Sequence, residues 1–233
     1  MERQRTETKT IIYATIMDLK QAAQERHTVR KYLDKPIPTD VQTLIDQRIE
    51  ENNEKHHLAI KLVTNDNTGI WAVMKLVAKN VNNFIVLAGD DADDLGERLG
   101  YASADLMLYA QALGLNTWWI GGSYNKSVRK FVGDKKVVGI VTIGYGATQG
   151  VQHKMKTYEQ VAHYEGEAPE WFKQGIAVAL LAPTAINKMA ANFTGKGDEV
   201  HLEVNNGAFS GVDKGIIKYH FEIGAGTEHF RWI

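Results

Sequence analysis

Residues 91–122 read DADDLGERLGYASADLMLYAQALGLNTWWIGG and carry the clearest structural pattern in the chain. We expect a long helix over 91–113, because Gly114 follows it and a glycine commonly ends a helix. The next residues, 116–120, are rich in tryptophan and β-branched side chains, which is typical of a buried strand. This strand runs directly into two glycines, where a backbone can approach a ligand closely.

The rest of the chain mixes helices and strands without strict alternation, which favours an α+β fold over a doubly wound sheet. The run Thr39-Asp-Val-Gln42 resembles a capping box, the signature of a helix start. Before residue 150 we expect further helices at 17–27 and 39–54, and strands at 57–64, 83–88 and 137–145. After it we expect helices at 169–181 and 212–225, a strand at 200–204 and a short C-terminal strand.

The polar segment 151–167 predicts a connector between a first lobe, 1–150, and a second lobe, 168–233. Residues 108–120 and 220–233 share a helix end, a glycine and a Trp-Ile strand, once one inserted residue is allowed. Two copies of a degenerate half would produce this similarity, and so would chance. Both explanations remain open at this point.

Composition excludes several kinds of protein. The 233 residues contain no cysteine, which rules out disulfides, thiolate nucleophiles, iron–sulfur clusters and cysteine zinc sites. A net charge of −1 argues against a nucleic-acid partner, and the longest apolar stretch, 175–186, is too short to span a membrane. The N-terminal MERQRTETKT has no hydrophobic signal core, so we expect a cytoplasmic protein. Histidines lack metal-ligand spacing, so we expect no metal.

Two groups of cations are candidates for binding a phosphate. The run Arg26-His27-Thr28-Val29-Arg30 combines two guanidiniums and a hydroxyl at a helix end, and arginine offers forked donors to phosphate oxygens. Lys154 and Lys156 alternate on an extended segment and so lie on one side. Taken alone, each group is also explained as a solvated run of charges.

Two further segments are candidates for holding a flat ring. Pro183 and Thr184 can start a short helix that aims the amide of Asn187 at a heteroaromatic edge. Gly121 and Gly122 can bring backbone N–H groups close to a planar ligand beside Trp118 and Trp119. Alone, the first segment reads as a helix-loop-helix junction and the second as ordinary core.

Together these segments resemble the FMN-dependent nitroreductase family. The likeness spans 17–233 and includes Ala-Pro-Thr-Ala-Ile-Asn at 182–187, Gly-Leu-Asn-Thr-Trp-Trp-Ile-Gly-Gly at 114–122, and Ile-Gly-Tyr-Gly at 143–146 before the lysine pair. In the common family pattern the Ala-Pro-Ser-like segment follows the arginine motif by a few tens of residues, whereas here it lies in the second lobe. The chain is therefore similar to a small subgroup with two nitroreductase-like halves. That implies a central, mostly antiparallel sheet with flanking helices, and an intrachain pseudo-dimer.

The resemblance also implies roles for individual residues. Arg26, His27 and Thr28 match positions at the phosphate and ribityl end of FMN, with Lys154 and Lys156 as further phosphate partners. Arg30 matches the cation near the flavin pyrimidine edge. The isoalloxazine edge would be held by Pro183, Thr184 and Asn187, and approached near N5 by Gly121 and Gly122.

The implied activity is electron transfer from NADH or NADPH, through FMN, to a nitroaromatic, a quinone or a related small-molecule acceptor in a ping-pong reaction. The flavin supplies the redox chemistry, so no catalytic side chain is demanded. The expected partners are small molecules, with no nucleic acid and no membrane, and the protein is expected to be a monomer or homodimer. Three alternatives remain: a reductase specific for one metabolite, an FMN sensor or storage protein without turnover, and an interaction module that has lost the cofactor.

Overall fold

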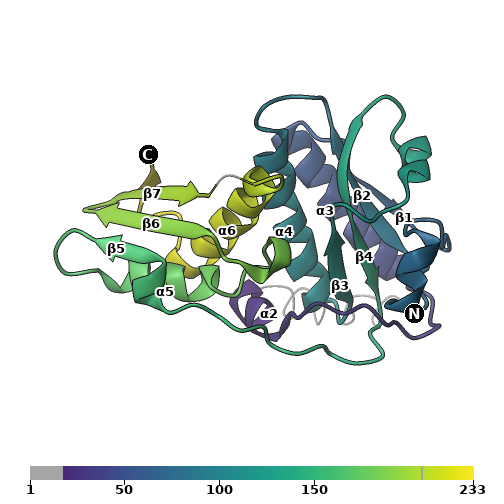
Figure 1. Ribbon diagram of the computed structural model, residues 1–233, viewed down its shortest axis with the longest axis horizontal. Coiled ribbons are helices and arrows are strands. Elements are labelled where there is room, and N and C mark those ends of the chain that lie inside the picture. The colour runs from purple at the N-terminus through teal and green to yellow at the C-terminus, as the bar shows by residue number, and fades with distance from the viewer. Residues whose placement is uncertain (1–17, 206) are drawn as a thin grey trace, which may run out of the picture.

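A computed structural model describes residues 18–205 and 207–233 and shows two sheets on either side of a central pair of helices (Figure 1). The first part of the chain contains α2 (Leu19–Glu25), α3 (Thr39–His56), β1 (Lys61–Val63), η1 (Ala72–Leu76), β2 (Phe84–Gly89), α4 (Leu95–Ala112), β3 (Asn116–Ile120), η2 (Lys126–Phe131) and β4 (Lys136–Gly144). The second contains η3 (Tyr158–Gln160), β5 (Ala162–Tyr164), α5 (Glu170–Ala179), η4 (Ala185–Asn187), β6 (Ala191–Lys196), β7 (Glu199–Val204), α6 (Ser210–Ala225) and β8 (Arg231–Trp232).

The first sheet is antiparallel, with strand order β1-β2-β4-β3. Strand β2 is buried along its whole length, so both of its faces are covered. Ile85 and Leu87 pack with α3 and α4, while Phe84 and Val86 pack in a second cluster on the opposite face. This alternation follows from the two-residue period of a strand.

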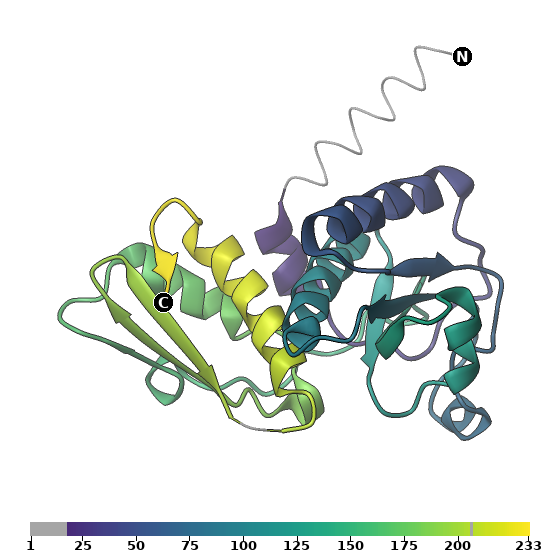
Figure 2. The ribbon, with the colours of Figure 1, turned by 90° about the horizontal axis from the view of Figure 1, so that it is seen from above.

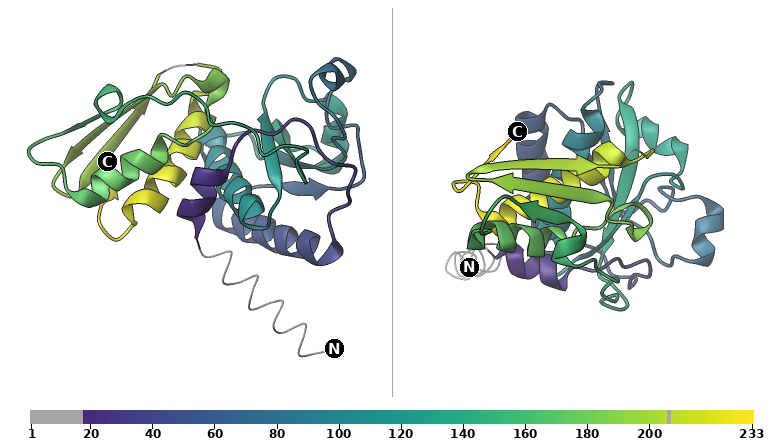
Figure 3. Two further views of the ribbon diagram at one scale, coloured as in Figure 1. Left: turned by 90° about the horizontal axis from the view of Figure 1, so that it is seen from below. Right: turned by 60° about the vertical axis from the view of Figure 1, so that its left-hand side comes forward.

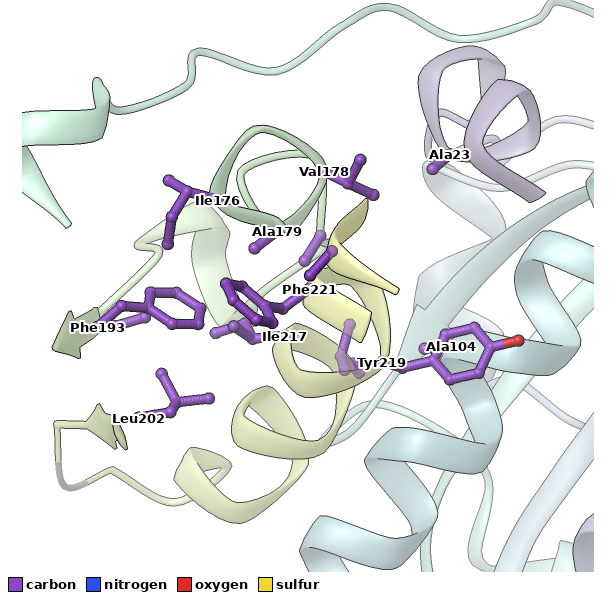
Figure 4. Close-up of a cluster of buried hydrophobic side chains, with 14 of the residues drawn as sticks. Ala23, Ala104, Ile176, Val178, Ala179, Phe193, Leu202, Ile217, Tyr219 and Phe221 are labelled. Atoms are coloured by element: carbon purple, nitrogen blue, oxygen red, sulfur yellow. The ribbon is translucent and has the colours of Figure 1, made fainter. Parts of the chain in front are cut away.

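The second sheet is mixed, with order β5-β6-β7-β8 and parallel pairing in its two outer pairs. Its inner face packs on α5 and α6 around aromatic and aliphatic side chains, among them Ile176, Phe193, Leu202 and Phe221 (Figure 4). The rings of Phe193 and Phe221 stack with centroids 5.2 Å apart. This core is distinct from the two clusters of the first sheet, and Trp119 and Val138 of that sheet pack against both this core and the cluster under α3 and α4.

Helices α4 and α6 cross at the centre of the molecule, where glycines allow close backbone contact (Figure 2). A Cβ atom on Gly100 would lie 2.1 Å from the carbonyl oxygen of Val212, and one on Gly215 would lie 2.0 Å from that of Glu97. These contacts are reciprocal, because each glycine is the sixth residue of its helix and each carbonyl belongs to the third residue of the other. Only glycine fits at such a crossing.

The order of elements is also repeated. Helix, two antiparallel strands, helix and strand follow one another as α3-β1-β2-α4-β3 and again as α5-β6-β7-α6-β8. In the second series β8 pairs directly with β7, whereas β4 separates β3 from β2 in the first. The repeated order and the reciprocal glycine contacts are what a duplicated half would produce.

The α+β class and the antiparallel sheet are confirmed, and most elements lie where the sequence placed them. The capping box at Thr39 is wrong: Pro38 is the cap, Thr39 is already helical, and the Gln42 side chain donates to the Ile37 carbonyl at 2.6 Å. The expected strand 57–64 shortens to β1, because His57 adopts a left-handed conformation that ends α3. Residue 17 of the first expected helix lies outside the described residues.

The sequence reasoning missed two strands of the second sheet. Strand β6 replaces the second helix of the expected helix-loop-helix junction, and it joins β7 through a tight turn in which Gly197 has φ of 58°. Strand β5 lies within the expected connector, which passes along the outside of the molecule from the first sheet to the second (Figure 3). Among residues 18–205 and 207–233, no helix is long and apolar enough to cross a membrane.

Candidate functional site

A cavity of about 620 Å³ lies where five parts of the chain meet. They are the segment after α2, the end of β3 with the following glycine, the start of the connector, and the second-half residues before β6 and at the start of α6. The lining residues are Arg26, His27, Thr28, Arg30, Trp118, Trp119, Gly121, Val151, Gln152, His153, Pro183, Thr184, Ala185, Ile186, Asn187, Phe209, Val212, Asp213 and Ile216. This volume is typical of a site for a cofactor or other small molecule.

The segment after α2 is held against the first sheet. Arg26 caps α2 by donating its N–H to the Ala22 carbonyl at 2.9 Å. Val29 then donates its N–H to the Thr117 carbonyl at 3.1 Å, which fixes the chain beside β3. Arg30 is exposed and lies over the ring of Trp118, 5.2 Å from its centroid. The backbone of the cationic motif is therefore anchored on a rigid strand.

Arg26 is a buried cation without a counter-charge in the described part of the chain. Its residue is 3% exposed, its Nε has no hydrogen-bond partner among these residues, and none of their carboxylates pairs with it. Burial lowers the pKa of Arg26 to about 10, so it stays charged at neutral pH. Burying an unpaired charge costs several kcal/mol. An anionic ligand at this end of the cavity would offset that cost.

The histidines around Arg26 support the same reading. Burial, together with the charge of Arg26, lowers the pKa of His27 and that of His153. His220 lies fully buried on α6, and burial, opposed by its hydrogen bond to the Ile216 carbonyl, lowers its pKa to about 3. These imidazoles are therefore mostly neutral at pH 7, and they neither add to nor offset the charge of Arg26.

The loop before β6 forms the opposite wall of the cavity. Asp213 of α6 accepts the N–H of Ala185 at 2.9 and 3.2 Å, and the Thr184 hydroxyl accepts the N–H of Met189 at 2.9 Å. These bonds hold Ile186 at φ of 48° and Asn187 at 57°. A β-branched residue in this conformation is strained, and such strain is concentrated at functional sites. Burial raises the pKa of Asp213, against the effect of its bond to Ala185.

Gly121 stands at the end of β3 with aromatic rings around it. A Cβ atom there would lie 2.4 Å from Cζ of Phe209 and 2.7 Å from Cζ3 of Trp119. The absence of a side chain at Gly121 therefore makes room for these two rings. Gly122 has open space around its α-carbon and is not part of the lining.

Eight of the eleven residues expected from the sequence line this one cavity: Arg26, His27, Thr28, Arg30, Gly121, Pro183, Thr184 and Asn187. Lys154 and Lys156 do not line it. Their connector passes close by, however, because the carbonyl of Lys154 accepts the Asn187 amide at 3.3 Å. The lysine side chains extend from an irregular segment, so their alternation in sequence does not aim them at the cavity.

Sequence reasoning missed the contribution of α6. Phe209, Val212 and Ile216 recur at intervals of three and four residues, so they lie on one face of the helix start, and Asp213 lies beside them. That spacing was readable, but it is equally typical of a buried core face. Only the position of α6 opposite β3 shows that this face borders a cavity.

The structure is thus an α+β fold with two sheets around a central helix pair, and a cavity between its two parts that can hold a small molecule. The family model described as "Putative TM nitroreductase" matches residues 18–225, and the chain belongs to this family. No curated protein matches it. The fold and the family resemblance seen in the sequence are thereby confirmed.

Solved structures agree with this fold. A protein from Thermotoga maritima described as "a putative nitroreductase" is 19% identical over 89% of this chain and 83% of its own, with a TM-score of 0.66. A protein from Desulfovibrio desulfuricans described as "a putative nitroreductase in complex with FMN" is 16% identical over 65% of this chain and 98% of its own, with a TM-score of 0.53. A third, in complex with FMN from Exiguobacterium sibiricum, is 16% identical over 64% and 98%, with a TM-score of 0.52.

Proposed function

We propose that this protein is an FMN-dependent oxidoreductase that passes electrons from NADH or NADPH to a nitroaromatic, a quinone or a related acceptor. The observation that carries the proposal is Arg26, a buried guanidinium without a counter-charge among the described residues, at one end of a cavity of about 620 Å³. A phosphate monoester supplies the missing negative charge. The FMN complexes of the Desulfovibrio and Exiguobacterium proteins support the choice of FMN.

The cavity offers distinct contacts to the two ends of FMN. Arg26, with His27 and Thr28 beside it, would hold the phosphate and the ribityl chain. Arg30 would lie at the pyrimidine edge of the ring, where negative charge gathers on reduction. Lys154 and Lys156 are outside the lining, so they would reach the phosphate only by extending their side chains toward it.

The second half of the chain would hold the ring. Asn187 carries an amide that can donate to and accept from a heteroaromatic edge, and Pro183 and Thr184 position it. Gly121, followed by Gly122, would allow the backbone to approach N5. FMN held in this cavity would supply two-electron redox chemistry between NAD(P)H and the acceptor. The protein's task is to orient the ring and leave one face open.

We further propose one FMN per chain, bound in an intrachain pseudo-dimer. Residues 180–190 join α5 to β6 and form a wall of the cavity, whereas only 57–60 join α3 to β1 at the corresponding place in the first half. The segment 26–30, with its two arginines, lies before the first half, and the second half has no copy of it. A second site related by pseudo-symmetry would therefore lack both its phosphate end and its wall.

The experiment that tests the proposal is the visible spectrum of purified, desalted protein with and without added FMN. Flavin bands at one equivalent per chain support it, and bleaching by NADH or NADPH without oxygen then distinguishes an enzyme from an FMN sensor or storage protein. Protein that stays colourless and does not take up FMN would contradict the proposal in favour of an interaction module.

A further inference from the structure

We propose that Phe209, backed by Trp119, is the specificity-determining wall that selects planar aromatic acceptors. The inference rests on the proposed function, because it assigns the acceptor side of the same cavity. Phe209 is the last residue before α6, is only partly buried, and lines the cavity. It comes from the second half of the chain, whereas Trp119 and Gly121 come from the first.

The ring of Phe209 is placed directly over the backbone of Gly121. A Cβ atom on Gly121 would lie 2.4 Å from Cζ and 2.5 Å from Cε1 of that ring. Trp119 meets Phe209 edge to face, with ring centroids 5.7 Å apart and planes at 79°. Two rings in this arrangement form a corner at the glycine, and a third aromatic ring can pack against the exposed side of Phe209.

The chemistry of the lining changes along the cavity. The segment after α2 contributes the polar and cationic side chains of Arg26, His27 and Arg30. The start of α6 contributes an apolar face made of Phe209, Val212 and Ile216. Asp213, the acidic member of the lining, already accepts the Ala185 N–H. The α6 end therefore favours flat, apolar molecules, because burial of aromatic surface is rewarded there and its one carboxylate is already engaged by a backbone N–H.

The test is the oxidation of chemically reduced protein in a stopped-flow instrument, which removes the nicotinamide ring from the experiment. FMN-loaded protein is reduced with dithionite and mixed with a naphthoquinone, which takes two electrons and two protons to become the hydroquinone. Ferricyanide serves as a second acceptor that needs no ring contact; two ions each take one electron. Binding of 2-naphthol, a planar compound the flavin does not reduce, is measured from the flavin spectrum.

For Phe209→Leu we expect the naphthoquinone concentration at half-saturation and the dissociation constant of 2-naphthol each to rise about tenfold. FMN affinity and the rate of oxidation by ferricyanide should stay unchanged. Phe209→Trp, which keeps a ring, should stay within about threefold of wild type in all four measurements. Phe230→Leu is the matched control, because Phe230 packs on Trp171 in the second-half core and away from the cavity.

Three results would overturn the proposal. Unchanged naphthoquinone and 2-naphthol binding in Phe209→Leu would show that the ring selects nothing. Equal losses for FMN and for both acceptors would assign Phe209 to the cofactor site instead. Wild-type protein that binds no FMN would refute the proposed function itself, and the role proposed for Phe209 would fall with it.

Discussion

Arg98 and Asp213 occupy the fourth positions of α4 and α6, and each holds the chain that follows the preceding helix of its own half. Arg98 donates to the carbonyls of His56 and His57 at 2.8 and 3.0 Å, whereas Asp213 accepts the N–H of Ala185. Equivalent positions thus carry opposite charges and hold opposite backbone groups. The basic residue secures a short turn, and the acidic one secures the longer loop that walls the cavity.

Replacing Asp213 should loosen that loop. Asp213→Ala leaves the N–H of Ala185 without its charged acceptor, an interaction worth about 1.5–3 kcal/mol. We expect FMN affinity to fall about tenfold and amide hydrogen exchange at 184–189 to speed up, measured by fluorescence titration and mass spectrometry. Asp198→Ala, at the exposed turn before β7, is the control. Unaltered exchange in Asp213→Ala would show that the loop is held by other contacts.

Arg26 should matter for the phosphate and not for the ring. Arg26→Met removes charge-assisted hydrogen bonds worth roughly 1.5–3 kcal/mol each, so FMN should bind at least tenfold more weakly while riboflavin binds as before. The free energy of unfolding of the FMN-free protein should stay equal or rise, because a buried, unpaired charge has been removed. Denaturant titration and fluorescence titration measure the two effects.

The lysine pair provides a comparison for Arg26. Because Lys154 and Lys156 do not line the cavity, the double alanine variant should weaken FMN binding less than threefold. A loss as large as that of Arg26→Met, with riboflavin binding retained, would show that both lysines reach the phosphate. Equal losses for FMN and riboflavin in Arg26→Met would remove Arg26 from the phosphate end.

Arg30 should tune the flavin potential. A cation near N1 and the C2 carbonyl stabilises the reduced, anionic ring more than the neutral, oxidised one. Arg30→Gln should therefore lower the two-electron potential by tens of millivolts, since 30 mV corresponds to about 1.4 kcal/mol. Spectroelectrochemical titration measures it, with the exposed Arg129→Gln as control. Identical midpoints for wild type and Arg30→Gln would identify Arg30 as an ordinary surface cation.

His220 should make the protein sensitive to acid. Its pKa is about 3 when folded and about 6.5 when unfolded, so the unfolded chain binds a proton over a range of pH where the folded chain does not. The stability that the neutral imidazole contributes is present above pH 6.5 and is lost as the pH falls toward 3. Between pH 7 and 4.5 this amounts to about 3 kcal/mol.

A substitution that cannot titrate should remove that loss. We expect His220→Gln to give a shallower fall in the free energy of unfolding between pH 7 and 4.5, measured by urea titration at each pH. His163→Gln, at an exposed strand position, should follow the wild-type curve. Parallel curves for wild type and His220→Gln would show that another group controls the acid response.

Local patterns in the sequence determined the α+β class, most helices and the buried strands, because hydrophobic periodicity and glycine punctuation act within a few residues. Strand β6 shows where this reasoning fails. It alternates buried and exposed residues as a strand should, but four of its six residues, Ala, Asn, Gly and Lys, are poor strand formers, and pairing with β5 and β7 decides its conformation.

The sequence also indicated which residue types could contact FMN, since arginine, glycine and amide chemistry is visible in the residues themselves. Only the tertiary structure decided that Arg26 and Asn187, far apart in the chain, border one cavity, and that Lys154 and Lys156 do not. The tertiary structure also showed that Phe209 lies over Gly121 and that Arg26 is buried. The physical reason is that burial, cavities and contacts between halves follow from the crossing of α4 and α6, which no local pattern encodes.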